Sequence, residues 1–154
     1  MEEHQPSGMY YEDFEKGQVV VSPGRTITEY DVMAFSGLSG DYNQLHTDQV
    51  FAESSMYGKR IAHGLMGPAL ASGLAARLGF SDGTALALTQ IKWKFTAPIY
   101  LGDTISARFT VDRKKRVSSQ AGGFIRFLVD ILNQEGEIVQ TGSWTLVMKT
   151  REKE

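Results

Sequence analysis

Three side chains that could activate a water molecule lie within the six residues 41–46. Asp41, Asn43 and His46 place a carboxylate, an amide and an imidazole on a glycine-rich stretch between two apolar segments. Imidazole is the side chain best suited to take a proton from water near neutral pH. A carboxylate beside it could accept a second hydrogen bond from the same water and support positive charge on the ring. We therefore predict a water-activating pair of Asp41 and His46, with Asn43 holding the loop.

The same spacing also allows a purely structural interpretation. Asp and Asn side chains often bond to the backbone two residues further along the chain and so form Asx turns. In this alternative Asp41 or Asn43 would shape a turn, and His46 would be an exposed loop residue. The spacing alone leaves both interpretations open.

A second element that could do chemistry begins at residues 62–65, which read Ala-His-Gly-Leu. The segment 64–78 is apolar on nearly all sides and rich in Gly, Ala and Ser, which predicts a buried helix. Gly64 would lie at its amino end, where free amides and the helix dipole can stabilise a developing oxyanion. The alternative is an ordinary helix start with His63 packed in the core. A water activator and an oxyanion site together would suit the addition of water to a conjugated thioester.

Short helices are expected on both sides of the loop that carries Asp41. An acid three residues after Thr28 is typical of a capping box, so we predict that a helix begins there and ends at the glycines that follow. Thr47 is predicted to cap a second short helix. The first helix would bury Val32, Phe35 and Leu38 and end at Gly37 and Gly40, and the second would carry Val50, Phe51 and Ala52.

Most of the remaining chain has the pattern of an antiparallel sheet. Apolar and polar residues alternate through the range 105–111, as in a strand with one buried face. Consecutive strands with short, glycine-containing connections favour antiparallel pairing. The strand-like ranges are 19–27, with a break near Pro23, and 86–95, 105–111, 124–132 and 138–148. One apolar helix and a long antiparallel sheet predict an α+β fold in which the sheet curls around the helix.

The composition limits the class of protein. The chain has 154 residues, 42% of them hydrophobic, so we expect a disordered tail over 1–7 and a single domain over 8–150. A net charge of −2 with no basic half disfavours nucleic-acid binding. The absence of cysteine excludes disulfides and thiolate chemistry. With only His46 and His63 in the expected folded body, we predict no metal site. Without a signal peptide or a bilayer-length apolar run, we predict a cytoplasmic protein with no membrane partner.

At these residues the chain resembles the MaoC-like dehydratases, or (R)-specific enoyl-CoA hydratases, of the hot-dog fold. Their motif contains Gly-Asp-x-Asn-Pro-Leu-His, then five residues and an alanine. Here residues 40–46 read Gly-Asp-Tyr-Asn-Gln-Leu-His, and Ala52 follows at the same spacing. The family's Ala-His-Gly-Met/Leu helix start is similar to residues 62–65. The departure is Gln44, since the family usually has a proline that would fix φ in the loop.

The resemblance implies an α+β hot-dog fold, with a long antiparallel sheet wrapped around a buried central helix. It implies that Asp41 and His46 are the catalytic pair that holds the hydrating water, and that the Gly64 amide donates to the thioester oxygen. It implies no cofactor, an acyl-CoA thioester substrate, and a homodimer or higher homo-oligomer joined at sheet edges. The further residues expected at the substrate are Asn43, His63, Leu65 and Ser72.

The expected activity is (R)-specific hydration of a 2-enoyl-CoA, or the reverse dehydration. Two alternatives stay open: a dehydratase for an acyl-carrier-protein or branched acyl-CoA thioester, and a non-catalytic acyl-thioester-binding subunit, which the departure at Gln44 keeps open. Residues 59–60 and 113–116 could bind the CoA phosphates, although a charged hairpin is usually only solvated. Trp93 and Phe95 are expected to be core strand residues rather than a platform for stacking a base.

Overall fold

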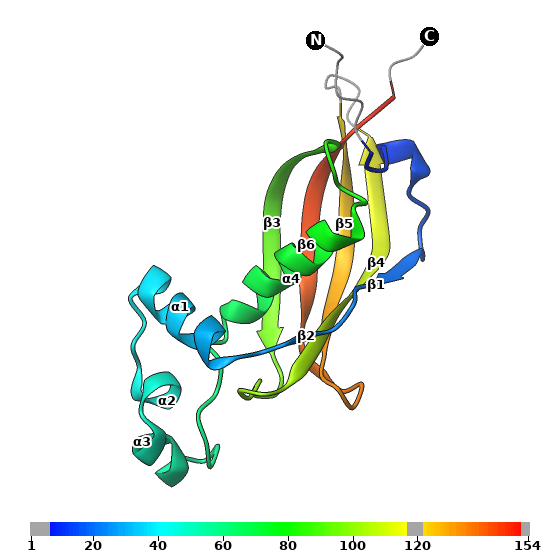
Figure 1. Ribbon diagram of the computed structural model, residues 1–154. Coiled ribbons are helices and arrows are strands. Elements are labelled where there is room, and N and C mark those ends of the chain that lie inside the picture. Colours follow the sequence, from blue (N-terminus) through cyan, green and yellow to red (C-terminus); the bar gives the residue numbers. More distant parts are fainter. Residues whose placement is uncertain (1–6, 117–121, 152–154) are drawn as a thin grey trace.

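A single antiparallel sheet curves around one long helix, and a group of short helices lies beside the start of that helix (Figure 1). The computed structural model describes residues 7–116 and 122–151. The strands are β1 (Val19–Val21), β2 (Arg25–Thr26), β3 (Ala85–Phe95), β4 (Thr104–Arg116), β5 (Gly122–Leu132) and β6 (Ile138–Lys149). The helices are the 3-10 turn η1 (Tyr11–Asp13) and α1 (Glu29–Ser39), α2 (Gln44–Thr47), α3 (Gln49–Ser54) and α4 (Met66–Leu78).

The strand order is β1-β4-β5-β6-β3, with β2 also paired to β4, and every pairing is antiparallel. The alternation predicted for β4 is confirmed, because Ile105, Ala107, Phe109 and Val111 are all buried. Residues of the same face of β5 join them against α4, and this layer forms the hydrophobic core. The break predicted near Pro23 is confirmed, since β1 ends before it and β2 begins after it. The predicted hot-dog architecture is therefore confirmed.

The predicted burial of the central helix α4 is confirmed on the side that faces the sheet, and in the isolated chain the opposite side is exposed. Met66, Ala71 and Leu74 face the sheet and are buried. Leu65, just before the helix, is 67% exposed, because a single sheet covers a single side. The helix ends as predicted at Gly79, which adopts the left-handed conformation that favours glycine (φ 72°).

Strand β3 is an edge strand, which explains one incorrect prediction about the core. It bonds to β6 on one side, and most of its side chains are exposed on both faces. Phe95, its last residue, is 54% exposed rather than buried in the core. Trp93 is half-buried and packs against the core, as predicted.

The predicted start of helix α1 is confirmed, and its predicted end is confirmed in part. Thr28 and Asp31 form the predicted capping box of α1, which ends at Gly40 (φ 76°), whereas Gly37 lies inside the helix. Leu38 is 86% exposed because the buried face of α1 runs through Val32 and the small Ser36 instead.

The predicted cap of the second helix is wrong by one residue. The carboxylate of Asp48 accepts the hydrogen bond from the Phe51 amide and caps α3. The hydroxyl of Thr47 instead donates to the backbone carbonyls of Tyr42 and Asn43, which lie one turn earlier.

Some predicted features lie partly or wholly outside the described residues. Residues 1–6 of the predicted tail are outside them, as are residues 120–121 of the glycine-containing connection expected between the strand-like ranges 105–111 and 124–132. Ser7, the last residue of the predicted tail, donates a hydrogen bond to Asp82. Within the described part of the chain, no helix is long and apolar enough to cross a membrane.

Candidate active site

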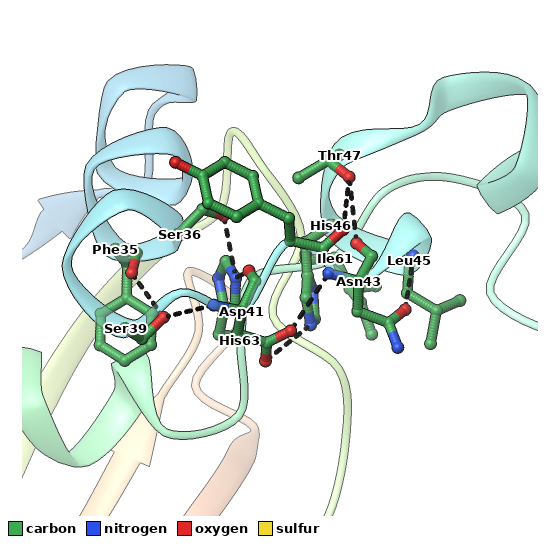
Figure 2. Close-up of polar contacts among 11 residues, drawn as sticks. Phe35, Ser36, Ser39, Asp41, Asn43, Leu45, His46, Thr47, Ile61 and His63 are labelled. Atoms are coloured by element: carbon green, nitrogen blue, oxygen red, sulfur yellow. Dashed lines mark hydrogen bonds and ion pairs between the residues drawn. The ribbon is translucent and has the colours of Figure 1, made fainter.

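Asp41, His46 and His63 come together beside the start of α4, although they lie on three different segments (Figure 2). Asp41 follows the glycine that ends α1, His46 lies in α2, and His63 belongs to the segment that leads into α4. Oδ2 of Asp41 lies 4.0 Å from Nε2 of His46. His46 is 8% exposed, so it is not the exposed loop residue of the structural alternative.

Two Asx turns shape the loop that carries this pair. The Asn43 amide donates to Oδ1 of Asp41 at 3.1 Å, and the Leu45 amide donates to Oδ1 of Asn43 at 2.9 Å. The second of these bonds caps α2, which then turns His46 toward the interior. The local turns of the structural alternative are thus present, and they build the arrangement that brings His46 to Asp41.

A backbone carbonyl determines which nitrogen of His46 is free. Nδ1 lies 2.8 Å from the carbonyl oxygen of Ile61. A carbonyl can only accept, so Nδ1 carries the hydrogen and the neutral ring has its lone pair on Nε2, which faces Asp41. Two hydrogen bonds of about 2.8 Å to one water, at an angle between 90° and tetrahedral, separate its partners by about 4.0 to 4.6 Å. The observed separation therefore suits one water held by both groups.

His63 packs against the pair in surroundings that favour its neutral form. Its ring stacks on that of His46 with centroids 3.8 Å apart, and it is 2% exposed. Nε2 lies 2.8 Å from the Asp41 carbonyl oxygen and 3.1 Å from the Ser36 hydroxyl, so Nε2 carries the hydrogen. Burial lowers the pKa of His63 by more than the bond to the Asp41 carbonyl raises it. A neutral ring avoids placing two cations face to face.

Arg60 anchors His46 from the other side and was not identified as part of the site from the sequence. Its Nε donates to the His46 carbonyl at 2.6 Å, and its two terminal nitrogens reach the two carboxylate oxygens of Glu29 at 2.9 Å each. These bonds already use Nε and both terminal nitrogens of the guanidinium, which disfavours the contact with a CoA phosphate that the sequence left open. Lys59 is exposed, with its ammonium 4.2 Å from the centre of the Tyr100 ring. No local pattern indicates these contacts, because Glu29 is 31 residues away.

The other basic segment considered for CoA belongs to a strand. Residues 113–116 form the end of β4 rather than a turn. Lys114 bonds to the Phe14 carbonyl, and Arg116 lies 3.8 Å from Glu12. Both acceptors lie next to or within η1, at the end of the sheet away from α1–α3 (Figure 1). This segment therefore lies apart from Asp41 and His46.

Gly64 lies in the turn before α4 with its amide available. Within residues 7–116 and 122–151, no group accepts a hydrogen bond from that amide. The Gly64 carbonyl accepts from the Gly67 amide at 3.1 Å and from Nε2 of Gln140 at 3.2 Å. Gly64, Ile61 and Phe95 line a cleft of about 410 Å³. Asp41 and His46 do not line this cleft, but Ile61, whose carbonyl holds His46, does.

Asp41, His46 and His63 are a poor fit for a single metal ion. One ligand atom from each of Asp41, His46 and His63 lies within 4.8 Å of the others. However, the two imidazoles stack at an interplanar angle of 30°. Because nitrogen lone pairs lie in the ring planes, rings that are nearly parallel do not direct them at one ion. The arrangement suits a hydrogen-bonded pair better.

The expected site residues thus divide into two groups. Asp41, His46 and His63 come together, with Asn43 shaping the loop between them. Leu65 and Ser72 instead lie along the exposed side of the α4 segment, where the Ser72 hydroxyl donates to the Ala69 carbonyl at 2.6 Å. Gly64 lies between the two groups in the chain.

Comparison with known proteins gives matches along most of the chain. The MaoC like domain matches residues 13–125. The chain is 35% identical over 109 residues to Protein MaoC of Klebsiella aerogenes, covering 71% of this chain but only 32% of that protein. It is 37% identical over 103 residues to an (R)-specific enoyl-CoA hydratase of Rhodospirillum rubrum, covering 66% of this chain and 69% of that enzyme.

A solved structure matches nearly the whole chain. It is a monoamine oxidase regulatory protein from Archaeoglobus fulgius, with a TM-score of 0.87 and 30% sequence identity. The match covers 94% of this chain and 97% of that one. The shared architecture is therefore not confined to the sheet, because the unmatched part of this chain is shorter than the segment from α1 to α3.

Proposed function

The chain belongs to the MaoC like domain family, and we propose that it adds water to a 2-enoyl-CoA to give an (R)-3-hydroxyacyl-CoA, or catalyses the reverse dehydration. The similarity to an (R)-specific enoyl-CoA hydratase supports this reaction. We further propose that residues 8–150 act as one domain in it. The observation that carries the proposal is the 4.0 Å approach of Asp41 to the nitrogen of His46 that the Ile61 carbonyl leaves free.

In the proposed mechanism, Nε2 of His46 takes one proton from a water molecule while Asp41 accepts a hydrogen bond from its other hydrogen. The water oxygen bonds to C3 of the enoyl thioester, and the π electrons of the C2–C3 bond move toward the thioester carbonyl. The Gly64 amide donates to the oxygen on which this charge collects. The proton on His46 then passes to C2, so one water has been added and the ring is neutral again. Dehydration is the same sequence in reverse.

The local structure around Gln44 supports a catalytic rather than a non-catalytic role. Gln44 is the first residue of α2, a position where proline is favoured because its missing amide hydrogen would have no helical partner. Asn43 has φ −53° and ψ 140°, and this ψ is in the range that residues before proline adopt. The loop therefore has the form that proline would impose, without the proline.

We also propose that two copies pair through β3. This edge strand exposes Leu86, Leu88, Ile91 and Phe95, and an unprotected apolar edge invites pairing with another strand. Pairing would extend the sheet and cover part of the exposed side of α4. Sedimentation of the purified protein tests this, and a monomer at micromolar concentration would contradict it.

The test of the activity replaces Asp41 by Asn and His46 by Ala. Hydration of crotonyl-CoA is followed by the loss of enoyl-thioester absorbance, and product chirality is determined with a stereospecific dehydrogenase. Each variant is expected to lose about 10²-fold or more in kcat, since acid–base groups contribute about 10² to 10⁴. Asp48→Asn is the matched control, because Asn also caps helices well and Asp48 caps α3 outside the pair.

The substrate panel separates the competing activities. Enoyl thioesters of CoA and of acyl carrier protein, straight and branched, are assayed side by side. Turnover of the CoA esters with an (R) product supports the proposal, and turnover of the carrier-protein esters alone would replace it with the second dehydratase activity. Full activity in both Asp41→Asn and His46→Ala would refute the catalytic roles.

A further inference from the structure

Gln140 is a buried polar residue in which both the oxygen and the nitrogen of the side-chain amide form hydrogen bonds. It lies in β6, is 3% exposed, and lines the cleft together with Gly64. Its Oε1 accepts the indole hydrogen of Trp93 at 2.8 Å, and its Nε2 donates to the Gly64 carbonyl at 3.2 Å. An indole can only donate and a carbonyl can only accept, so the partners fix the orientation of the amide. Burying an amide is costly unless it is bonded in this way.

The start of α4 is packed directly onto this amide. A Cβ atom added at Gly67 would lie 1.9 Å from Oε1 of Gln140 and 2.5 Å from its Cδ. Only glycine lets the helix backbone approach so closely. Gln140 therefore contacts both the turn at Gly64 and the first turn of the helix that follows it.

We infer that Gln140 is a positioning residue for the thioester site, fixing the turn that presents the Gly64 amide while Trp93 fixes Gln140. Glycine has no side chain to restrict its backbone, so the direction of its amide depends on what holds the turn. A bond to the Gly64 carbonyl holds the Gly64–Leu65 peptide plane. That plane meets, at the Gly64 Cα, the His63–Gly64 plane that carries the Gly64 amide, whose own carbonyl accepts from the Met66 amide at 3.0 Å. Gln140 therefore fixes one side of the turn at Gly64. An oxyanion donor is effective when its direction is set before the reaction begins. This inference rests on the proposed function, which supplies the oxyanion.

Gln140→Met tests the inference, because methionine has a similar length and no hydrogen-bonding amide. We expect kcat for crotonyl-CoA to fall by about tenfold to 10²-fold, at or below the loss of about 10² to 10³ that follows removal of an oxyanion donor itself, while KM stays within about threefold. A merely structural residue would lower the melting temperature without this division between kcat and KM. Gln140→Glu keeps the acceptor for Trp93 but loses the donor to Gly64, so it should lose kcat as well.

A spectroscopic measurement reports on the amide itself. The absorption band of cinnamoyl-CoA moves to longer wavelength when its carbonyl is hydrogen bonded. Bound to an Asp41→Asn background, which slows turnover, the probe should show this shift, and addition of Gln140→Met should reduce it. An undiminished shift in a folded double variant, or a kcat within twofold of the parent, would overturn the inference.

A second pair of variants covers the possibility that Gln140→Met does not fold. Gly67→Ala alone places its methyl group against the Gln140 amide and should reduce stability. Gly67→Ala combined with Gln140→Ala relieves this clash and lets the new methyl fill part of the vacated space. The double variant should regain stability over Gly67→Ala but not kcat, and recovery of both would refute the positioning role. If the parent protein hydrates no enoyl thioester, the proposed function fails instead.

Discussion

Arg60 joins α1 to the short helix that carries His46, and replacing it by methionine tests what that connection contributes. Its Nε donates to the His46 carbonyl at 2.6 Å, and its terminal nitrogens reach both carboxylate oxygens of Glu29 at 2.9 Å. The Arg60 side chain is 14% exposed, whereas that of Glu29 is 59% exposed. Arg60→Met keeps much of the apolar stem and removes every donor, while Glu29→Gln weakens only the ion pair.

The two contacts differ in expected strength because they differ in exposure. A solvent-exposed ion pair contributes about 0.2 to 1 kcal/mol, and a hydrogen bond from a charged donor about 1.5 to 3 kcal/mol. Arg60→Met should therefore lower the free energy of unfolding by about 2 to 4 kcal/mol and Glu29→Gln by at most about 1 kcal/mol. For a chain of this size, a loss of 1 kcal/mol lowers the melting temperature by about 2 to 4 °C. The melting temperature should therefore fall by about 4 to 16 °C in Arg60→Met and by at most about 4 °C in Glu29→Gln.

Thermal and urea unfolding followed by circular dichroism measure both variants against the parent protein. We also expect kcat for hydration to fall further in Arg60→Met than in Glu29→Gln, because only the first loses the anchor on the His46 backbone. Equal destabilisation by the two changes would refute this reasoning, since the energy would then lie in the exposed pair. An unchanged melting temperature in Arg60→Met would refute it as well.

Two further predictions concern pH and the loop. The pKa of His63 is lower in the folded protein than in the unfolded chain, so the unfolded chain binds the proton first. The contribution of His63 to stability is complete above the unfolded pKa of about 6.5 and is lost as the pH falls from there through the folded pKa. Urea titrations should therefore show that the free energy of unfolding depends less on pH in His63→Gln than in the parent protein. The same pH dependence in both proteins would contradict this. Gln44→Pro should raise the free energy of unfolding by about 0.4 to 1 kcal/mol with kcat preserved, because Gln44 already occupies the first position of a helix, which suits proline. Lower stability of this variant in urea would show that the loop backbone does not suit proline.

Features with a local period or a local cap could be predicted from the sequence. The long strands were predicted because alternation in β4 repeats over many residues, and the end of α4 because Gly79 is a strong local signal. The cap at Thr47 was wrong because two adjacent residues can both cap and only packing selects Asp48. The exposure of Phe95 depends on strand order, which a sequence pattern does not contain. Contacts such as Gln140 with Gly64, 76 residues apart, have no local signal at all.

The segment 61–64 explains why the two motifs of the sequence belong together. The Ile61 carbonyl selects the free nitrogen of His46, and the His63 ring holds the Asp41 backbone. Gly64 follows directly with its available amide. The segment is itself fixed, because the Ile61 amide donates to the Leu45 carbonyl at 3.2 Å and the Ala62 amide to the Ile99 carbonyl at 2.7 Å.

Four consecutive residues thus set the direction of the proposed base, of its carboxylate partner and of the proposed oxyanion donor. A shift of this segment would move all three groups at once, since each is attached to it through the backbone or a buried ring. The water-activating motif and the Ala-His-Gly motif therefore depend on the position of the same backbone segment, residues 61–64. The pair at Asp41 and His46 has a defined geometry only when the second motif lies beside it.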